Sequence, residues 1–145
     1  MRSSSWRRGA RPLAVALAAL AVAVAVAGCL TTHELLVDRG WKLVEVAGAT
    51  PSDPDGRSGV TFEADGRFTL DTGCNSGDGT YRLEGNRILV ETQNLTERAC
   101  DGATGAQEAD VLAVLGAGPT WSIDTGSGRL RLSAESGARL VFETP

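Results

Sequence analysis

The segment 71–81, DTGCNSGDGTY, places one cysteine, Cys74, among glycines and polar residues, where its thiol could act as a nucleophile, a metal ligand or half of a disulfide. A nucleophilic thiol needs a nearby base, and the single histidine of the chain, His33, lies far upstream. A zinc site takes three or four ligands, usually Cys or His, and three cysteines with one distant histidine do not supply them. We therefore expect no catalytic residue, no metal site and no cofactor.

The N-terminus accounts for one of the three cysteines. Four arginines and no acid precede an uncharged run of Leu, Ala and Val over residues 13–28. This run is shorter than the roughly 20 apolar residues of a membrane-spanning helix and is typical of an export signal. It ends in residues 26–29, VAGC, which resembles the bacterial lipobox. We expect cleavage between Gly28 and Cys29 and a lipid on Cys29; the alternatives are an uncleaved anchor and an ordinary secretory signal.

Lipidation of Cys29 leaves two cysteines, Cys74 and Cys100, in an exported chain. Disulfides persist in oxidising compartments outside the cytoplasm. We expect Cys74 and Cys100 to be bridged, which in the chain-entropy account stabilises the fold by roughly 3.5 kcal/mol. Two structural free thiols or a reactive pair are the alternatives at this stage.

The rest of the chain divides into a lipidated tether, residues 29–39, and one domain, residues 40–145. The formal charge of −4 becomes −8 once the four arginines of the signal, residues 1–28, are removed. An acidic surface repels nucleic acid and anionic lipid headgroups, so the expected membrane contact is the lipid on Cys29. We expect a monomer on the cell membrane, facing the periplasm or exterior. Leu30 after the lipidated cysteine favours the outer membrane if the cell is Gram-negative.

Short runs of alternating apolar and polar residues, separated by turn residues, predict about eight antiparallel strands. A three-residue loop, residues 64–66, is the choice that puts apolar residues of both strands on one face, because it pairs Phe62 with Phe68. The same argument predicts further pairs, which are Val60 with Leu70, Leu83 with Ile88, Tyr81 with Val90, Leu132 with Leu140, Leu130 with Phe142, Ile123 with Leu130 and Trp121 with Leu132.

One segment has helical spacing instead. Apolar residues at 111, 112 and 115 predict a helix over about residues 105–115, with Thr104 and Gln107 as a capping box and Gly116 or Gly118 at its end. The predicted fold is mainly β, a small antiparallel barrel or strongly curved sheet of about eight strands with one α-helix. Bulky inward residues favour a filled barrel over a ligand cavity. The prolines and glycines of residues 48–59 predict an irregular insert.

Several of these pieces together resemble the META domain family. They are Gly40-Trp41, Gly73-Cys74-Asn75, Gly79-Thr80-Tyr81 and the segment 96–100, TERAC. The resemblance covers nearly all of the chain after the tether, and Arg98 departs from it where the family often has methionine. It implies a compact β-rich fold with one helix, often on envelope lipoproteins, without established enzymatic activity. It also implies a role in envelope stress or drug tolerance.

The residues and the resemblance together predict a non-enzymatic envelope lipoprotein with a structural or stress-related role. We interpret Gly73-Cys74-Asn75 as a structural corner, because asparagine tolerates left-handed backbone and hydrogen-bonds across turns. The alternative function is a binding module that inhibits a hydrolase or captures another partner through the insert, residues 48–59. Acid pairs such as Asp53 with Asp55 are expected by chance in so acidic a chain and do not indicate catalysis.

Overall fold

The structure, a computed structural model, describes residues 33–145, in which residues 34–145 form one packed unit. The expected export signal, cleavage site and lipidated Cys29 lie outside the described residues. Among residues 33–145, no helix combines the length and apolar character needed to cross a membrane.

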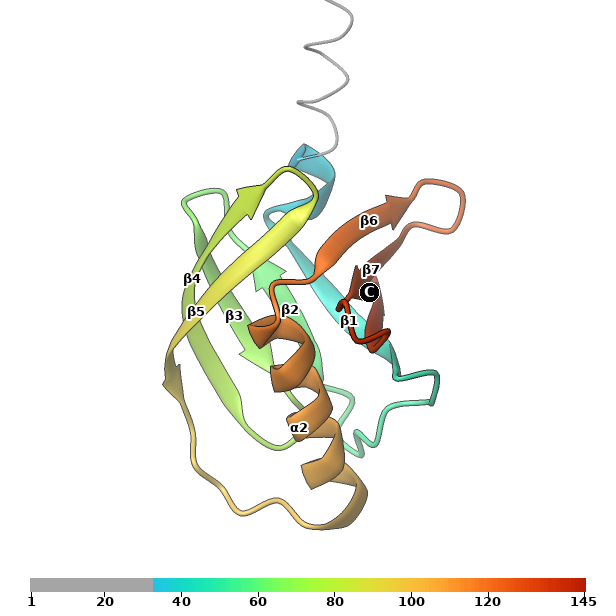
Figure 1. Ribbon diagram of the computed structural model, residues 1–145. Coiled ribbons are helices and arrows are strands. Elements are labelled where there is room, and N and C mark those ends of the chain that lie inside the picture. The colour runs from blue at the N-terminus through green and yellow to red at the C-terminus, as the bar shows by residue number, and fades with distance from the viewer. Residues whose placement is uncertain (1–32) are drawn as a thin grey trace, which may run out of the picture. The chain divides into compact units, whose positions relative to one another are not determined.

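Eight antiparallel strands close into a barrel in which each strand pairs with its sequence neighbours and the last pairs with the first (Figure 1). The strands are β1 (Arg39–Val46), β2 (Gly59–Phe62), β3 (Arg67–Asp71), β4 (Ser76–Glu84), β5 (Arg87–Leu95), β6 (Thr120–Asp124), β7 (Arg129–Ser133) and β8 (Arg139–Glu143). The helix α2 (Gly102–Gly116) lies between β5 and β6 in the chain. The predicted mainly β fold and its strand count are confirmed.

The predicted hairpin registers are also confirmed. Phe62 pairs with Phe68 across the β2–β3 hairpin, and Gly66 has the left-handed φ of 87° that its loop requires. All the other predicted pairs in the β4–β5, β6–β7 and β7–β8 hairpins are present as well. Period-two alternation combined with turn residues was therefore sufficient to fix which face of each strand is buried.

The seam between β5 and β6 is the narrowest of the barrel, with one register pair, Arg87 with Thr120. The longest pairing, between β4 and β5, is interrupted by a register shift between Asp78 and Gly79. A Cβ at Gly79 would lie only 2.1 Å from the carbonyl oxygen of Glu91. Glycine at this position thus permits the close approach of the two strands at the irregularity.

The barrel interior is filled by aromatic and aliphatic side chains from the strands and from one face of α2. The fully buried large residues include Trp41, Phe62, Phe68 and Phe142. All the residues of the predicted cross-strand pairs belong to the core or pack against it; Leu83, Val90, Trp121 and Ile123 are its partly exposed members. The filled interior agrees with the expectation of a packed barrel.

The core extends into the segment expected to be a tether. Residues 33–36 are helical, Leu36 is fully buried and Val37 is nearly so. The indole Nε1 of Trp41 donates a hydrogen bond of 2.8 Å to the carbonyl oxygen of Leu36. The packed domain therefore begins near Glu34 rather than at Gly40.

The predicted start of the helix is wrong. Helix α2 begins at Gly102 instead of residue 105, its N-cap is Asp101, and no side chain caps it. Thr104 and Gln107 therefore do not form a capping box, because both side chains bond to the insert instead. The C-terminus is as predicted: the helix ends at Gly116, and Gly118 has a φ of 62°.

Candidate functional site

The corner between β3 and β4, residues 72–75, is the most densely hydrogen-bonded part of the described chain. Gly73 has a φ of 94°, and its N–H donates to the Asp71 carboxylate at 2.8 Å. A Cβ at this position would lie 2.7 Å from both Gln107 Nε2 and Ser58 Oγ. Backbone conformation and crowding both therefore require glycine here.

Asn75, only 3% exposed, connects this corner to the segment that follows β5. Its Oδ1 accepts hydrogen bonds of 2.8 Å from the Thr96 hydroxyl and from the Arg98 N–H. Its Nδ2 donates to the Arg98 carbonyl oxygen at 3.1 Å and to Glu108 Oε1 at 3.0 Å. The whole amide is used, which supports the interpretation of a structural corner.

Two adjacent residues of α2, Gln107 and Glu108, hold the corner from the helix side. Glu108 Oε2 accepts a 2.7 Å hydrogen bond from the buried Thr72 hydroxyl, whose oxygen in turn accepts from the Asn75 N–H at 2.9 Å. Gln107 Nε2 donates to the Thr72 carbonyl oxygen at 2.6 Å and to Ser58 Oγ at 3.0 Å. Buried polar groups are thus paired across three segments distant in sequence.

The insert, residues 48–59, is irregular as predicted but is attached to the helix. The Ser52 N–H donates to Gln107 Oε1 at 2.6 Å, and the Ser58 N–H donates to Asp53 Oδ2 at 2.6 Å. Partial burial alone would raise the pKa of Asp53, but hydrogen bonds from Ser58, Arg57 and Gly56 outweigh it and lower that pKa below its usual value.

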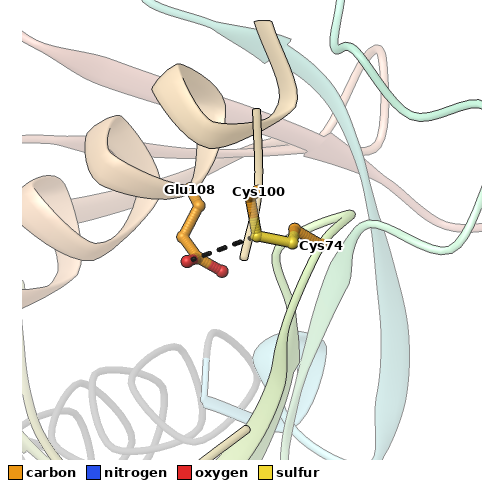
Figure 2. A group of neighbouring side chains, drawn as sticks. All are labelled: Cys74, Cys100 and Glu108. Atoms are coloured by element: carbon orange, nitrogen blue, oxygen red, sulfur yellow. Dashed lines mark hydrogen bonds between the residues drawn. A yellow bond between two sulfur atoms is a disulfide. The ribbon is translucent and has the colours of Figure 1, made fainter. Parts of the chain in front are cut away.

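Cys74 and Cys100 form a disulfide, with Cα atoms 6.0 Å apart (Figure 2). The bridge joins the corner to the residues just before α2. Figure 2 shows the Glu108 carboxylate directed at Cys100, with Oε1 3.8 Å from Cys100 Sγ. Asn75 Nδ2 lies 3.3 Å from the same sulfur. In the bridged state the sulfurs are neither nucleophiles nor metal ligands, and the arrangement acts as a cross-link.

The other motif residues lie away from the corner. Trp41 and Tyr81 are core residues, and the Tyr81 hydroxyl donates to the Glu63 carbonyl oxygen at 2.8 Å. Burial, together with the negative charges of Asp38 and Asp65, raises the pKa of Tyr81. Nothing lies within 4 Å of a Cβ built on Gly40, so the structure gives no steric reason for glycine there. Gly79 lies at the β4–β5 irregularity described above.

Sequence reasoning missed Thr72, Gln107 and Glu108 as members of the corner. One signal was present: Gln107 lies four residues before Val111, on the buried face of α2. A polar residue that lies on the apolar face of a helix can be a buried hydrogen-bonding group. This position therefore fits that role as well as the role of a helix cap.

The outer face of β1–β3, next to the insert, carries an open groove of about 460 Å³. Its lining includes Lys42, Arg57 and Asp71, and Arg57 lies 3.6 Å from the Asp71 carboxylate. The lining also includes two glycines, Gly40 and Gly59.

The sequence was compared with protein-family models and with curated proteins. The family model "META domain" matches residues 34–145. No curated protein matches the chain in sequence.

Three solved structures share the fold. A protein from Burkholderia xenovorans, solved by NMR, is 23% identical with a TM-score of 0.58, covering 77% of this chain and 85% of that chain. A second NMR structure is 16% identical with a TM-score of 0.62, covering 77% and 92%. A crystal structure of a DUF4847 family protein from Bacteroides vulgatus is 19% identical with a TM-score of 0.55, covering 76% and 94%. These likenesses concern the fold alone.

The family match begins where the packed unit begins, at Glu34, and includes the corner, the disulfide and α2. The chain belongs to the META domain family.

Proposed function

We propose that this chain is an exported lipoprotein, held at the cell envelope by a lipid on Cys29, whose META domain is a non-enzymatic structural module. Its proposed contribution is to the tolerance of envelope stress or drugs. The basic head, apolar run and VAGC sequence of residues 1–29 support export and lipidation.

The single observation that carries a structural role is the mutual pairing of the corner's polar groups. Three polar side chains form hydrogen bonds to the insert, the corner and the segment before α2; they are Asn75, Gln107 and Glu108. The disulfide fixes the same region covalently. Such a cross-linked region suits a domain that works outside the reducing cytoplasm.

Intact mass of the protein from the membrane fraction, with and without reductant, tests the proposal. Cleavage before Cys29 and a mass increment for the attached lipid are expected, with a two-proton difference on reduction of the bridge. The variant Cys29→Ala is the matched control and should lose both cleavage and lipid. Full-length, unlipidated wild-type protein in the membrane fraction would contradict the anchor.

The structural role has its own test in cells. A strain lacking the chain should be less tolerant of envelope-active drugs. It should be rescued by the wild type and by the exposed-site variant Asp110→Asn, but not by Cys29→Ala. Equal tolerance with and without the chain would contradict the stress role while leaving the anchor intact.

The groove beside the insert favours a second candidate, a module that binds a partner at the envelope. Because Ser52 and Ser58 of the insert hold Gln107, deleting the insert would disturb the fold as well as the groove. A point change, Arg57→Ala, removes a groove cation whose side chain pairs with the exposed Asp55 and the half-buried Asp71. Loss of a co-purifying partner with Arg57→Ala, but not with Arg82→Ala on β4, would favour this candidate.

A further inference from the structure

We propose that the reduced form of this corner is a metal site, in which the thiolates of Cys74 and Cys100 and the carboxylate of Glu108 bind one thiophilic divalent cation such as Zn²⁺. The two sulfurs and a Glu108 carboxylate oxygen lie within 4.8 Å of one another (Figure 2). The site goes beyond the structural role proposed above, and the bridged form does not bind metal in this way.

The spacing of the donor atoms suits a tetrahedral cation. Zinc takes sulfur at about 2.3 Å and carboxylate oxygen at about 2.0–2.2 Å, so two such ligands lie about 3.6 Å apart. Cys100 Sγ and Glu108 Oε1 are 3.8 Å apart already. The two sulfurs must separate from bonded contact to about 3.8 Å. Cys74 Sγ, which lies within 4.8 Å of the Glu108 oxygen, must come to about 3.6 Å from it.

Charge also favours a cation at this position. Within residues 33–145, none of the salt bridges includes Glu108. Its hydrogen-bond donors, Thr72 and Asn75, are both neutral. The partly buried Glu108 carboxylate therefore faces two sulfur atoms without a cationic partner. Once the sulfurs become thiolates, the negative charge there is uncompensated.

The backbone supplies a fourth donor and the corner orients it. The Arg98 carbonyl oxygen lies 3.3 Å from Cys100 Sγ and 3.9 Å from Cys74 Sγ. Asn75 Nδ2 donates to this oxygen and to Glu108 Oε1, so one amide positions two of the four ligand atoms. Groups that hold ligands in this way are a regular part of metal sites.

Counting ligands by Cys and His alone excluded such a site at the level of sequence. Glu108 changes that count, because carboxylate oxygen is also a zinc ligand. The helix brings Glu108 to the cysteines from outside their own loop, which the spacing in sequence does not reveal.

The chemistry balances with a dithiol as the reductant. The dithiol gives two electrons and two protons to the Cys74–Cys100 disulfide and becomes a disulfide itself. A divalent cation then displaces the two thiol protons and is held by two thiolates and one carboxylate. A disulfide oxidant that takes two electrons from the thiolates, with two protons from solvent, becomes a dithiol, re-forms the Cys74–Cys100 bridge and releases the cation.

Cobalt and zinc titrations of the full chain in detergent test the site. Every sample carries Cys29→Ser, so that Cys74 and Cys100 are the only thiols. After reduction by a phosphine and its removal, Co²⁺ should give thiolate-to-metal absorption that saturates at one equivalent and is lost on adding Zn²⁺. The oxidised protein and the Cys74→Ser/Cys100→Ser variant should give no such band.

Two variants of α2 test whether Glu108 is a metal ligand or merely an acid near the site. Glu108→Gln should weaken Co²⁺ binding by more than about tenfold, while Asp110→Asn, an exposed acid two residues away, should leave it unchanged. No thiolate band in the reduced Cys29→Ser protein, or equal affinity after adding Glu108→Gln, overturns the proposal. Circular dichroism of the same samples adds a third outcome: a reduced protein that is unfolded and that Zn²⁺ does not refold also overturns it.

Discussion

The side-chain amide of Asn75 makes four of the corner's hydrogen bonds. Its Oδ1 accepts from Thr96 and Arg98, and its Nδ2 donates to Arg98 and Glu108. The variant Asn75→Asp keeps the acceptor for Thr96 and Arg98 N–H but places a carboxylate oxygen where Nδ2 now faces Glu108 at 3.0 Å. Two carboxylates at that distance repel, and the Arg98 carbonyl loses its donor. We expect the free energy of unfolding at pH 7 to fall by about 2–4 kcal/mol.

Urea denaturation followed by circular dichroism measures this loss. Because one carboxyl of the pair becomes protonated in acid, the deficit of Asn75→Asp should shrink as the pH falls. The control is Asn86→Asp, which introduces the same charge in the exposed β4–β5 turn. Equal stability of Asn75→Asp and wild type would show that the amide hydrogen bonds contribute nothing.

Gly73 offers a second test at a single residue. Gly73→Ala must adopt a φ near 94° and bring a methyl group to 2.7 Å from Gln107 and Ser58. Left-handed backbone costs about 1–2 kcal/mol, and overpacking adds about 1–3 kcal/mol. Gly85→Ala, at a φ of 61° with open space around it, should show only the backbone cost. Thermal melts of both variants that agree within error would contradict the crowding argument.

At the scale of elements, the strands were predictable and the helix start was not, for one physical reason. Hairpin registers such as Phe62 with Phe68 follow from local alternation and turn length, which the sequence displays directly. Gln107 instead bonds to Ser52, Ser58 and Thr72, which are brought to it by the tertiary fold. Its spacing from Thr104 matched a capping box, and tertiary partners prevailed over that local pattern.

The same limit applies to the start of the domain and to the site. Leu36 and Val37 are too short an apolar run to show a period, although they contact the core. The pairing of Cys74 with Cys100 could be predicted because the expected lipid on Cys29 leaves only two cysteines. Glu108 could not be assigned to them, because no local pattern links a helix residue to a β-hairpin corner.

The insert gives the prediction that belongs to the element scale. The pKa of Asp53 is lowered in the folded protein, so its ionised form stabilises the fold. That contribution is present above the unfolded pKa of about 3.9 and is lost as the pH falls through the lowered folded value. Asp53→Asn should therefore be less stable than wild type at pH 7, and the difference should diminish below pH 4.

Urea unfolding at pH 7 and at pH 3 measures the change. Asp55→Asn serves as the matched control, since it removes the same charge from the same insert at an exposed carboxylate that pairs only with Arg57. A difference between wild type and Asp53→Asn that stays constant over this pH range would contradict the hydrogen-bonded carboxylate.

For the whole molecule, the disulfide adds a covalent cross-link between the β3–β4 corner and the approach to α2, residues 96–101. It closes a loop with a sequence separation of 26 that contains all of β4 and β5. Loop-closure entropy for that length corresponds to about 3.5 kcal/mol, and measured values are often lower. The barrel strands themselves pair without the bridge, so its loss should weaken the fold without changing the architecture.

The double variant Cys74→Ala/Cys100→Ala should therefore unfold cooperatively with a native-like circular dichroism spectrum, at a free energy about 2–4 kcal/mol below wild type. Wild-type protein in reductant should approach the same value, whereas reductant should not affect the double variant. Hydrogen exchange should rise most at residues 96–101, because this segment is then held to the corner by hydrogen bonds alone, from Asn75 to Thr96 and Arg98 and from Ser76 to Thr96. Exchange that rises uniformly over all eight strands instead would show that the bridge supports the barrel as a whole rather than the approach to α2.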